Sequence, residues 1–166
     1  AVIERFGAVD GLINCAGIIQ PFVRLKDLDY AVIERVFAVN WLGTLYLTRA
    51  FLPHLLGRPV AHVVNISSMG GFLPVPGQTI YGASKAALNR MTNALAEEVW
   101  GTGVRVNTVE PRAAVHSEGA DAHLAGALDD DQFESMADMV AGALILCACG
   151  PEVTGGTHVS LDLLGK

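Results

Sequence analysis

The sequence has 166 residues, of which 51% are hydrophobic and 17% are charged, and its formal net charge at pH 7 is −6. This apolar fraction is enough for a core, which excludes an intrinsically disordered or low-complexity chain. The weak negative charge provides no electrostatic attraction to nucleic acid or to an anionic membrane. The longest strongly apolar segment, residues 139–150, is shorter than the ~20 residues that span a bilayer, so we expect a soluble protein.

Helix-like and strand-like segments alternate along the chain. In chain order, hydrophobic periodicity predicts a helix end at 1–6, a strand at 12–15, helices at 29–40 and 42–56, a strand at 60–66, a helix at 81–100, a strand at 104–109, a helix at 131–149 and a strand at 157–161. This order is typical of βαβ units. We therefore expect a Rossmann-like α/β fold, with a doubly wound parallel sheet and helices on both of its faces. No repeat or linker divides residues 1–166, which predicts a single domain.

The three cysteines predict neither a disulfide framework nor a metal centre. Cys15, Cys147 and Cys149 are odd in number and have apolar neighbours, which is typical of reduced thiols in a cytoplasmic protein. Cys147 and Cys149 are separated by one residue, and no second Cys or His pair completes a zinc site. The acidic segment 129–131 is interpreted as a loop whose last residue, Asp131, caps the following helix.

The residues with the clearest chemical meaning are Ser68, Tyr81 and Lys85. Tyr81 and Lys85 are four residues apart on a predicted helix, so their side chains can share one face. An ammonium group beside a phenol stabilises the phenolate and lowers its pKa toward the working range of a general acid or base. Ser68 ends the preceding predicted strand, where its hydroxyl can bind a substrate oxygen. The alternative, an accidental pair on a helix surface, does not account for Ser68.

Four segments, taken together, resemble the short-chain dehydrogenase/reductase family. In chain order they are Asn14-Cys15-Ala16-Gly17, the helix residue Asn40, the group Ser68, Tyr81 and Lys85, and Asn107-Thr108-Val109-Glu110-Pro111. The resemblance extends from about residue 6 to the C-terminus. It implies an oxidoreductase that transfers a hydride between NAD or NADP and a secondary alcohol or ketone.

The same resemblance implies a role for each of these residues. Ser68 orients the substrate carbonyl and Tyr81 is the general acid/base. Lys85 lowers the pKa of Tyr81 and holds the nicotinamide ribose, and Asn40 positions a water molecule of the proton relay. The residues expected to contact the cofactor are Asn14, Cys15, Ala16, Gly17, Tyr81, Lys85, Pro111 and Ala114. Family members commonly form homodimers or homotetramers, so we expect a homo-oligomer.

The chain also departs from the family pattern. None of its 18 glycines forms the glycine-rich turn that holds the pyrophosphate, so we expect the chain to begin before the family's fourth strand and to lack the first three. Arg112 replaces a glycine, and it either reaches a cofactor phosphate or an acidic substrate or is a solvated loop residue. Cys15 replaces an asparagine and is expected to be a buried structural residue. His116 stands where the family has a threonine, and residues 117–128 match its substrate-covering loop.

Two other functions fit parts of the sequence. The missing glycine-rich turn allows a degenerate homologue or fragment that acts only as an assembly or binding module, whose first strand would be an unpaired apolar edge. A nucleotide-sugar epimerase or dehydratase also uses the Tyr-x-x-x-Lys spacing, but the short C-terminal part leaves no room for a sugar-binding subdomain. The intact Ser68, Tyr81, Lys85 and Asn40 favour the dehydrogenase.

Overall fold

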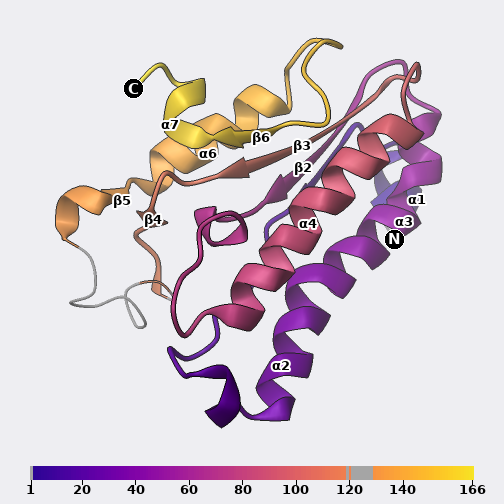
Figure 1. Ribbon diagram of the computed structural model, residues 1–166. Coiled ribbons are helices and arrows are strands. Elements are labelled where there is room, and N and C mark those ends of the chain that lie inside the picture. The colour runs from indigo at the N-terminus through magenta and orange to yellow at the C-terminus, as the bar shows by residue number, and fades with distance from the viewer. Residues whose placement is uncertain (1, 119, 121–128) are drawn as a thin grey trace.

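The computed structural model describes residues 2–118, 120 and 129–166. Its main sheet has four parallel strands in the order β1-β2-β3-β6 (Figure 1). The strands are β1 (Gly11–Asn14), β2 (Ala61–Ile66), β3 (Val104–Glu110) and β6 (Thr157–Val159). The four predicted strands and their parallel arrangement are confirmed. The last strand ends at Val159, before the predicted residue 161, because Ser160 begins the short helix α7 (Ser160–Leu163).

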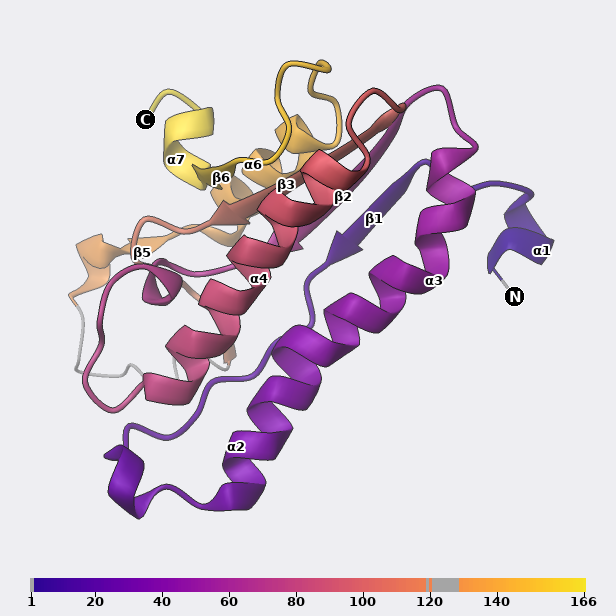
Figure 2. The ribbon, with the colours of Figure 1, turned by 45° about the vertical axis from the view of Figure 1, so that its right-hand side comes forward.

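Helices cover both faces of this sheet, as the alternating pattern predicts (Figure 2). On one face lie α3 (Thr44–Leu56) and α4 (Thr79–Glu98), and their apolar side chains pack with Val63 and Val106 of the two central strands. On the other face lies α6 (Met136–Leu146), which packs on Val64 and Val109. The continuous apolar character of β2 and β3 follows from this double cover.

The N-terminal helices differ from the prediction in one respect. The short helix α1 (Val2–Phe6) ends at Gly7, whose positive φ of 79° suits a residue without a side chain. The two helices expected at 29–40 and 42–56 form one rod, because α2 (Tyr30–Phe37) continues through a π-helical segment, Ala38–Gly43, into α3. Asn40 lies in this wider turn and is buried.

The predicted helix at 131–149 starts later than expected. A 3₁₀ turn, Asp130–Gln132, is followed by β5 (Phe133–Glu134), which pairs in parallel with β4 (Ala114–Val115). Helix α6 then begins at Met136, where the Ser135 hydroxyl accepts the Asp138 N–H at 3.0 Å. The expectation that Asp131 caps the helix is therefore wrong, because strand pairing takes up the residues that follow it.

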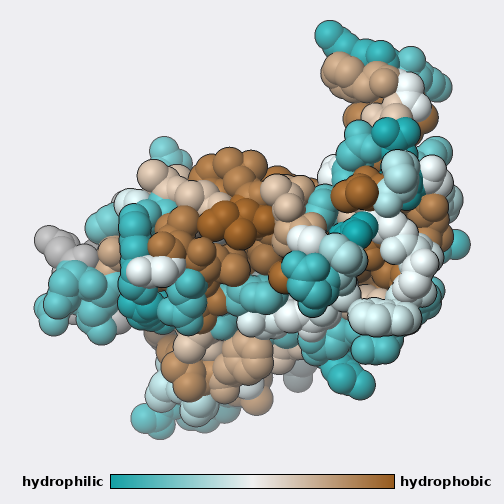
Figure 3. Space-filling model, turned by 90° about the horizontal axis from the view of Figure 1, so that it is seen from above, coloured by the Kyte–Doolittle hydropathy of each residue, from teal (hydrophilic) through white to brown (hydrophobic). Residues whose placement is uncertain are grey.

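Among the described residues, apolar side chains are exposed on β1 and on α6. β1 lies at one edge of the sheet, and no described strand pairs with its outer edge. The Ile13 side chain of this strand is 47% exposed. On α6, Met136, Val140 and Leu144 are exposed and recur at four-residue spacing. Figure 3 shows hydrophobic side chains gathered on the face seen from above, the side on which α6 and α7 lie in Figure 1. Among the helices described, none is long and apolar enough to cross a membrane.

Candidate active site

Lys85 and Tyr81 lie on the first turns of α4, at the carboxyl end of the sheet. The Lys85 side chain is buried, and its Nζ lies 5.8 Å from the centre of the Tyr81 ring. The ammonium donates a hydrogen bond of 2.9 Å to the main-chain oxygen of Ile66, the last residue of β2. Burial lowers the pKa of Lys85 to about 8, and the neighbouring Cys15 acts in the opposite direction. In the part of the chain that the structure describes, the other two ammonium protons have no acceptor.

Ser68 lies beside Tyr81, as the sequence predicts. It precedes the short 3₁₀ turn η3 (Met69–Gly71), and its hydroxyl accepts the Gly70 N–H at 3.2 Å. A Cβ atom on Gly70 would lie 3.5 Å from the Ser68 Oγ and 3.6 Å from the Tyr81 ring. The turn therefore passes directly along both side chains, which places the two hydroxyl groups next to each other.

The expected net lowering of the Tyr81 pKa is wrong for this structure. Burial of the phenol raises the pKa of Tyr81, because it disfavours the phenolate, and a side-chain hydrogen bond with Ser68 opposes this only in part. The Lys85 ammonium is directed at the Ile66 carbonyl. Tyr81 is accordingly in its protonated form at neutral pH.

Asn40 links α4 to the loop that follows β1. Its Oδ1 accepts the Ile18 N–H at 2.8 Å, and its Nδ2 donates to the Ile18 carbonyl at 2.9 Å and to the Ser84 Oγ at 3.0 Å. Both amide protons are thus used inside the protein. A Cβ atom on Gly17 would lie 3.5 Å from the Lys85 Nζ and 3.6 Å from the Asn40 Oδ1, so Gly17 lies between these two side chains.

The turn Asn14-Cys15-Ala16-Gly17 divides into a buried and an exposed part. Asn14 is buried, whereas Cys15, Ala16 and Gly17 are exposed where the chain leaves β1. The expectation of a buried Cys15 is therefore wrong, because the strand ends one residue earlier and the thiol lies beyond the sheet. Of these exposed residues, Gly17 and Cys15 lie near the Lys85 ammonium.

Asn14 belongs to a buried polar row that crosses the sheet, formed by Asn14, Asn65, Thr92 and Thr108. The Asn14 Nδ2 donates to the Asn65 Oδ1 at 2.8 Å, and the Asn65 Nδ2 donates to the Thr92 Oγ1 at 2.9 Å. The Thr108 hydroxyl donates to the same Thr92 oxygen at 2.8 Å. The Asn14 amide nitrogen is therefore engaged inside the protein, and its Oδ1 is buried without a hydrogen-bond partner in the described part of the chain.

Glu110 ends β3 and is 3% exposed. Its Oε2 is buried and has no hydrogen-bond partner in the described part of the chain. Because side chains alternate along a strand and Thr108 bonds Thr92 of α4, Glu110 also faces α4. Burial raises the pKa of Glu110 to about 7. The sequence places Glu110 in a strand-end motif but assigns no role to its side chain, since its effect depends on how deeply the fold buries it.

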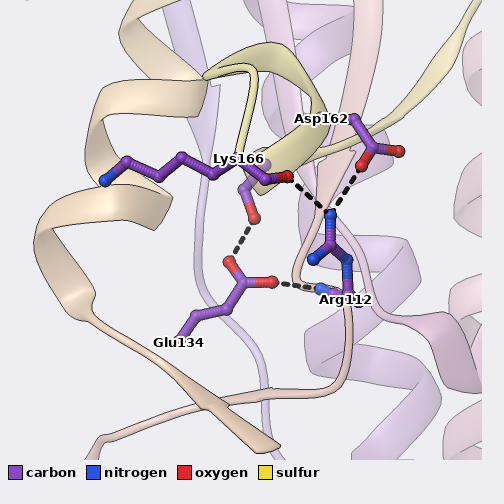
Figure 4. A network of polar contacts seen from close by, with 5 residues as sticks. Arg112, Glu134, Asp162 and Lys166 are labelled. Carbon is purple, nitrogen blue, oxygen red and sulfur yellow. Dashed lines mark hydrogen bonds and ion pairs between the residues drawn. The ribbon is translucent and has the colours of Figure 1, made fainter.

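Arg112 is held by the C-terminal segment (Figure 4). Its guanidinium donates to the Asp162 carboxylate at 2.8 Å and to the main-chain oxygen of Lys166 at 3.0 Å. Its main-chain N–H donates to Glu134, whose second oxygen accepts the Ser160 hydroxyl. Arg112 is exposed, which agrees with the predicted solvated loop residue, and its guanidinium is also paired with Asp162.

The other residues expected on this side of the site are only partly described. Pro111 and Ala114 lie in the segment after β3, and both side chains are buried. His116 stacks on Phe133 with ring centres 4.4 Å apart. Of the predicted substrate-covering loop at 117–128, residues 119 and 121–128 lie outside the described residues. Within the described residues, no group of His, Cys, Asp or Glu side chains could hold a metal ion.

Sequence reasoning missed Gln20, which is completely buried beneath the start of α4. Its Oε1 accepts the N–H groups of Ile80 and Tyr81, both at 2.8 Å. A single glutamine in a loop, about 60 residues from its partners, has no local signature in a sequence.

Comparison with known proteins agrees with this geometry. The short chain dehydrogenase family model matches residues 1–123. The chain belongs to the short-chain dehydrogenase/reductase family. An uncharacterized oxidoreductase of Staphylococcus epidermidis is 38% identical over 113 residues, which cover 67% of this chain and 48% of the relative. The 3-oxoacyl-[acyl-carrier-protein] reductase FabG of Thermotoga maritima is 38% identical over 112 residues, covering 66% of this chain and 44% of the reductase.

The fold of this short-chain dehydrogenase is shared over almost its whole length by solved structures. The structure of ElxO with NADP bound superposes with a TM-score of 0.87 at 24% sequence identity, and the match covers 99% of this chain and 71% of ElxO. This similarity confirms the Rossmann-like architecture. The chain spans about half the length of the curated relatives it matches.

Proposed function

We propose that this chain carries the catalytic part of an NAD- or NADP-dependent oxidoreductase acting on a small secondary alcohol or ketone. The observation that carries the proposal is the group of Ser68, Tyr81 and Lys85, in which adjacent hydroxyls lie next to a buried ammonium at the carboxyl end of a parallel sheet. In such sheets ligands bind at this end of the strands. Membership of the short-chain dehydrogenase family supports the same reaction class.

The residues around Lys85 suit the nicotinamide end of the cofactor. The Lys85 ammonium uses one donor on the Ile66 carbonyl, and its two remaining donors suit the hydroxyls of a ribose. Gly17, whose Cβ would lie in van der Waals contact with this ammonium, leaves space on the exposed side of the turn. We propose that Cys15, Ala16 and Gly17 border the cofactor, with Pro111 and Ala114 shaping the site through the segment after β3. A bound nicotinamide would supply or accept the hydride.

Tyr81 acts as the proton donor in the proposed reduction. The substrate carbonyl oxygen accepts hydrogen bonds from the Ser68 and Tyr81 hydroxyls, which polarise the carbonyl carbon. As the carbon is reduced, the proton of the Tyr81 hydroxyl moves to the substrate oxygen, leaving a phenolate. The positive charge of Lys85 stabilises this phenolate. The raised pKa of Tyr81 keeps the acid form ready at neutral pH, and alcohol oxidation uses the same groups in reverse.

Asn40 supports the same reaction as part of the proton supply. Its side chain holds Ile18 and Ser84, so a relay water would use the second lone pair of Oδ1 or the main-chain oxygen of Asn40. We further propose a cytoplasmic location, supported by the free cysteines. A homodimer or homotetramer is supported by the exposed apolar stripe of α6.

Replacement of the phenol hydroxyl tests the function directly. The protein is expressed from its complete reading frame and offered NADH or NADPH with a panel of ketones and a 3-oxoacyl thioester, while loss of the reduced nicotinamide is followed by absorbance. We expect Tyr81→Phe to lower turnover at least ~100-fold and to leave cofactor affinity nearly unchanged. Turnover equal to the wild type would refute the role of Tyr81, and binding without turnover in both proteins would favour the binding module.

A further inference from the structure

The start of α4 is capped from a distant loop. The first N–H groups of a helix have no partner inside the helix, and a neighbouring Ser, Thr, Asp or Asn usually accepts them. Here the residue at the cap position, Gln78, makes no capping bond with its side chain. The Oε1 of Gln20 instead accepts the N–H groups of Ile80 and Tyr81, both at 2.8 Å.

Gln20 has no freedom to move within this contact. It is 0% exposed, and its Nε2 donates to the Gly77 carbonyl at 2.8 Å. Its own main-chain oxygen accepts from the Gln78 side chain at 3.0 Å. Four hydrogen bonds therefore lock residue 20 to the segment that begins α4, and releasing them would leave buried polar groups unpaired.

The loop that contains Gln20 is also linked to the main-chain carbonyl of Tyr81. The Ser84 hydroxyl donates to the Tyr81 carbonyl at 2.7 Å. Ser84 in turn accepts from Asn40, whose amide pairs with the N–H and the carbonyl of Ile18. The Tyr81 N–H is thus bound by Gln20, and the Tyr81 carbonyl is linked through Ser84 and Asn40 to Ile18. Both connections lead to residues 18–20.

This loop follows directly from the turn proposed to border the cofactor. Gly17 lies against the Lys85 ammonium, and Ile18 and Gln20 come next in the chain. A shift of the turn would therefore be passed to the main chain of Tyr81 through two short hydrogen-bonded connections. Misplacing a reacting group by about 1 Å can cost about 100-fold in rate.

We propose that Gln20 is a positioning residue, which fixes the position of the Tyr81 hydroxyl relative to the turn at residues 14–17. This inference rests on the proposed function, because it assigns to Gln20 an effect exerted through the general acid. It places the effect of Gln20 on the reaction step rather than on cofactor affinity.

A double-mutant cycle in the protein from its complete reading frame tests this. Gln20→Met keeps the length of the side chain but removes its acceptor and donor. We expect kcat to fall about 10- to 100-fold, with the Kd for NADPH changing less than about 2-fold. In the Tyr81→Phe background, the same substitution should cause no further loss of the residual rate, because the hydroxyl that it positions is absent.

Asn107→Leu provides the matched control. Asn107 is also a buried amide that joins a strand to a loop, donating to the Val153 carbonyl at 2.8 Å and accepting the Gly156 N–H at 3.2 Å, on the opposite face of the sheet. We expect Asn107→Leu to lower the melting temperature about as much as Gln20→Met does and to leave kcat unchanged. An equal loss of kcat in both variants, or an equal loss from Gln20→Met with and without the Tyr81 hydroxyl, would overturn the inference. Full activity of Tyr81→Phe alone would instead refute the proposed function.

Discussion

The buried carboxyl group of Glu110 makes the stability of the fold depend on pH. Its pKa is raised from 4.5 to about 7, so the folded state holds this proton more tightly than the unfolded state does. The stabilisation is complete below the unfolded pKa and is lost as pH rises from about 4.5 through about 7. The full shift corresponds to about 3 kcal/mol, which we reduce to about 1–2 kcal/mol for screening by solvent near the end of the strand.

Glu110→Gln removes this pH dependence while keeping the size of the side chain. At pH 8 we expect the variant to be more stable than the wild type by about 1–2 kcal/mol, which corresponds to a few degrees in Tm for a domain of this size. At about pH 4.5 most of the difference should be gone, because the wild-type carboxyl is then protonated in the folded state and about half protonated in the unfolded state.

Thermal unfolding of both proteins between pH 4.5 and pH 8 measures the effect, with Glu97→Gln, an exposed site on α4, as the control. The control should keep a constant difference from the wild type over this range. The reasoning fails if Glu110→Gln also keeps a constant difference, or if it is the less stable protein at pH 8.

Two further predictions concern Lys85 and Arg112. The lowered pKa of Lys85, about 8, predicts that turnover declines as pH rises above that value, because the ammonium then loses its proton. Lys85→Arg should move this decline to higher pH in a pH–rate profile, whereas an unchanged profile would show that another group titrates. Arg112→Gly should leave the Kd for NADPH unchanged in a fluorescence titration and lower stability by at most ~1 kcal/mol, since its partner Asp162 is exposed. Asp162→Asn is the matched control, and weaker NADPH binding by Arg112→Gly alone would assign the arginine to the cofactor.

The strands and the group of Ser68, Tyr81 and Lys85 were predictable because their signals are local. Continuous β-branched segments predict the two central strands, and the four-residue spacing of Tyr81 and Lys85 places them on one helix face. The side-by-side position of Ser68 follows from its place at the end of β2. Each of these inferences needs only the periodicity of one element and the rule that parallel strands end at one edge.

The features that were predicted wrongly or missed depend on distant partners. Asp131 suits a helix cap by type, but pairing of β5 with β4 delays the helix to Met136. Burial of Tyr81 reverses the expected direction of its pKa shift. Gln20 meets its partners only after the chain has folded. Arg112 likewise finds Asp162 across 50 residues of sequence.

The buried polar row of Asn14, Asn65, Thr92 and Thr108 has a consequence for folding accuracy. Purely apolar strands can slide past one another with little loss, since one β-branched side chain replaces another. A slide of one residue between β1 and β2 would turn Asn14 to the opposite face and leave the Asn65 amide without its partner. The polar row therefore favours the native register of the strands, because a shifted register loses its buried hydrogen bonds. The polar row thereby aligns the carboxyl ends of β1, β2 and β3. The loops that follow these strands leave the sheet at the same level, so that their side chains can meet.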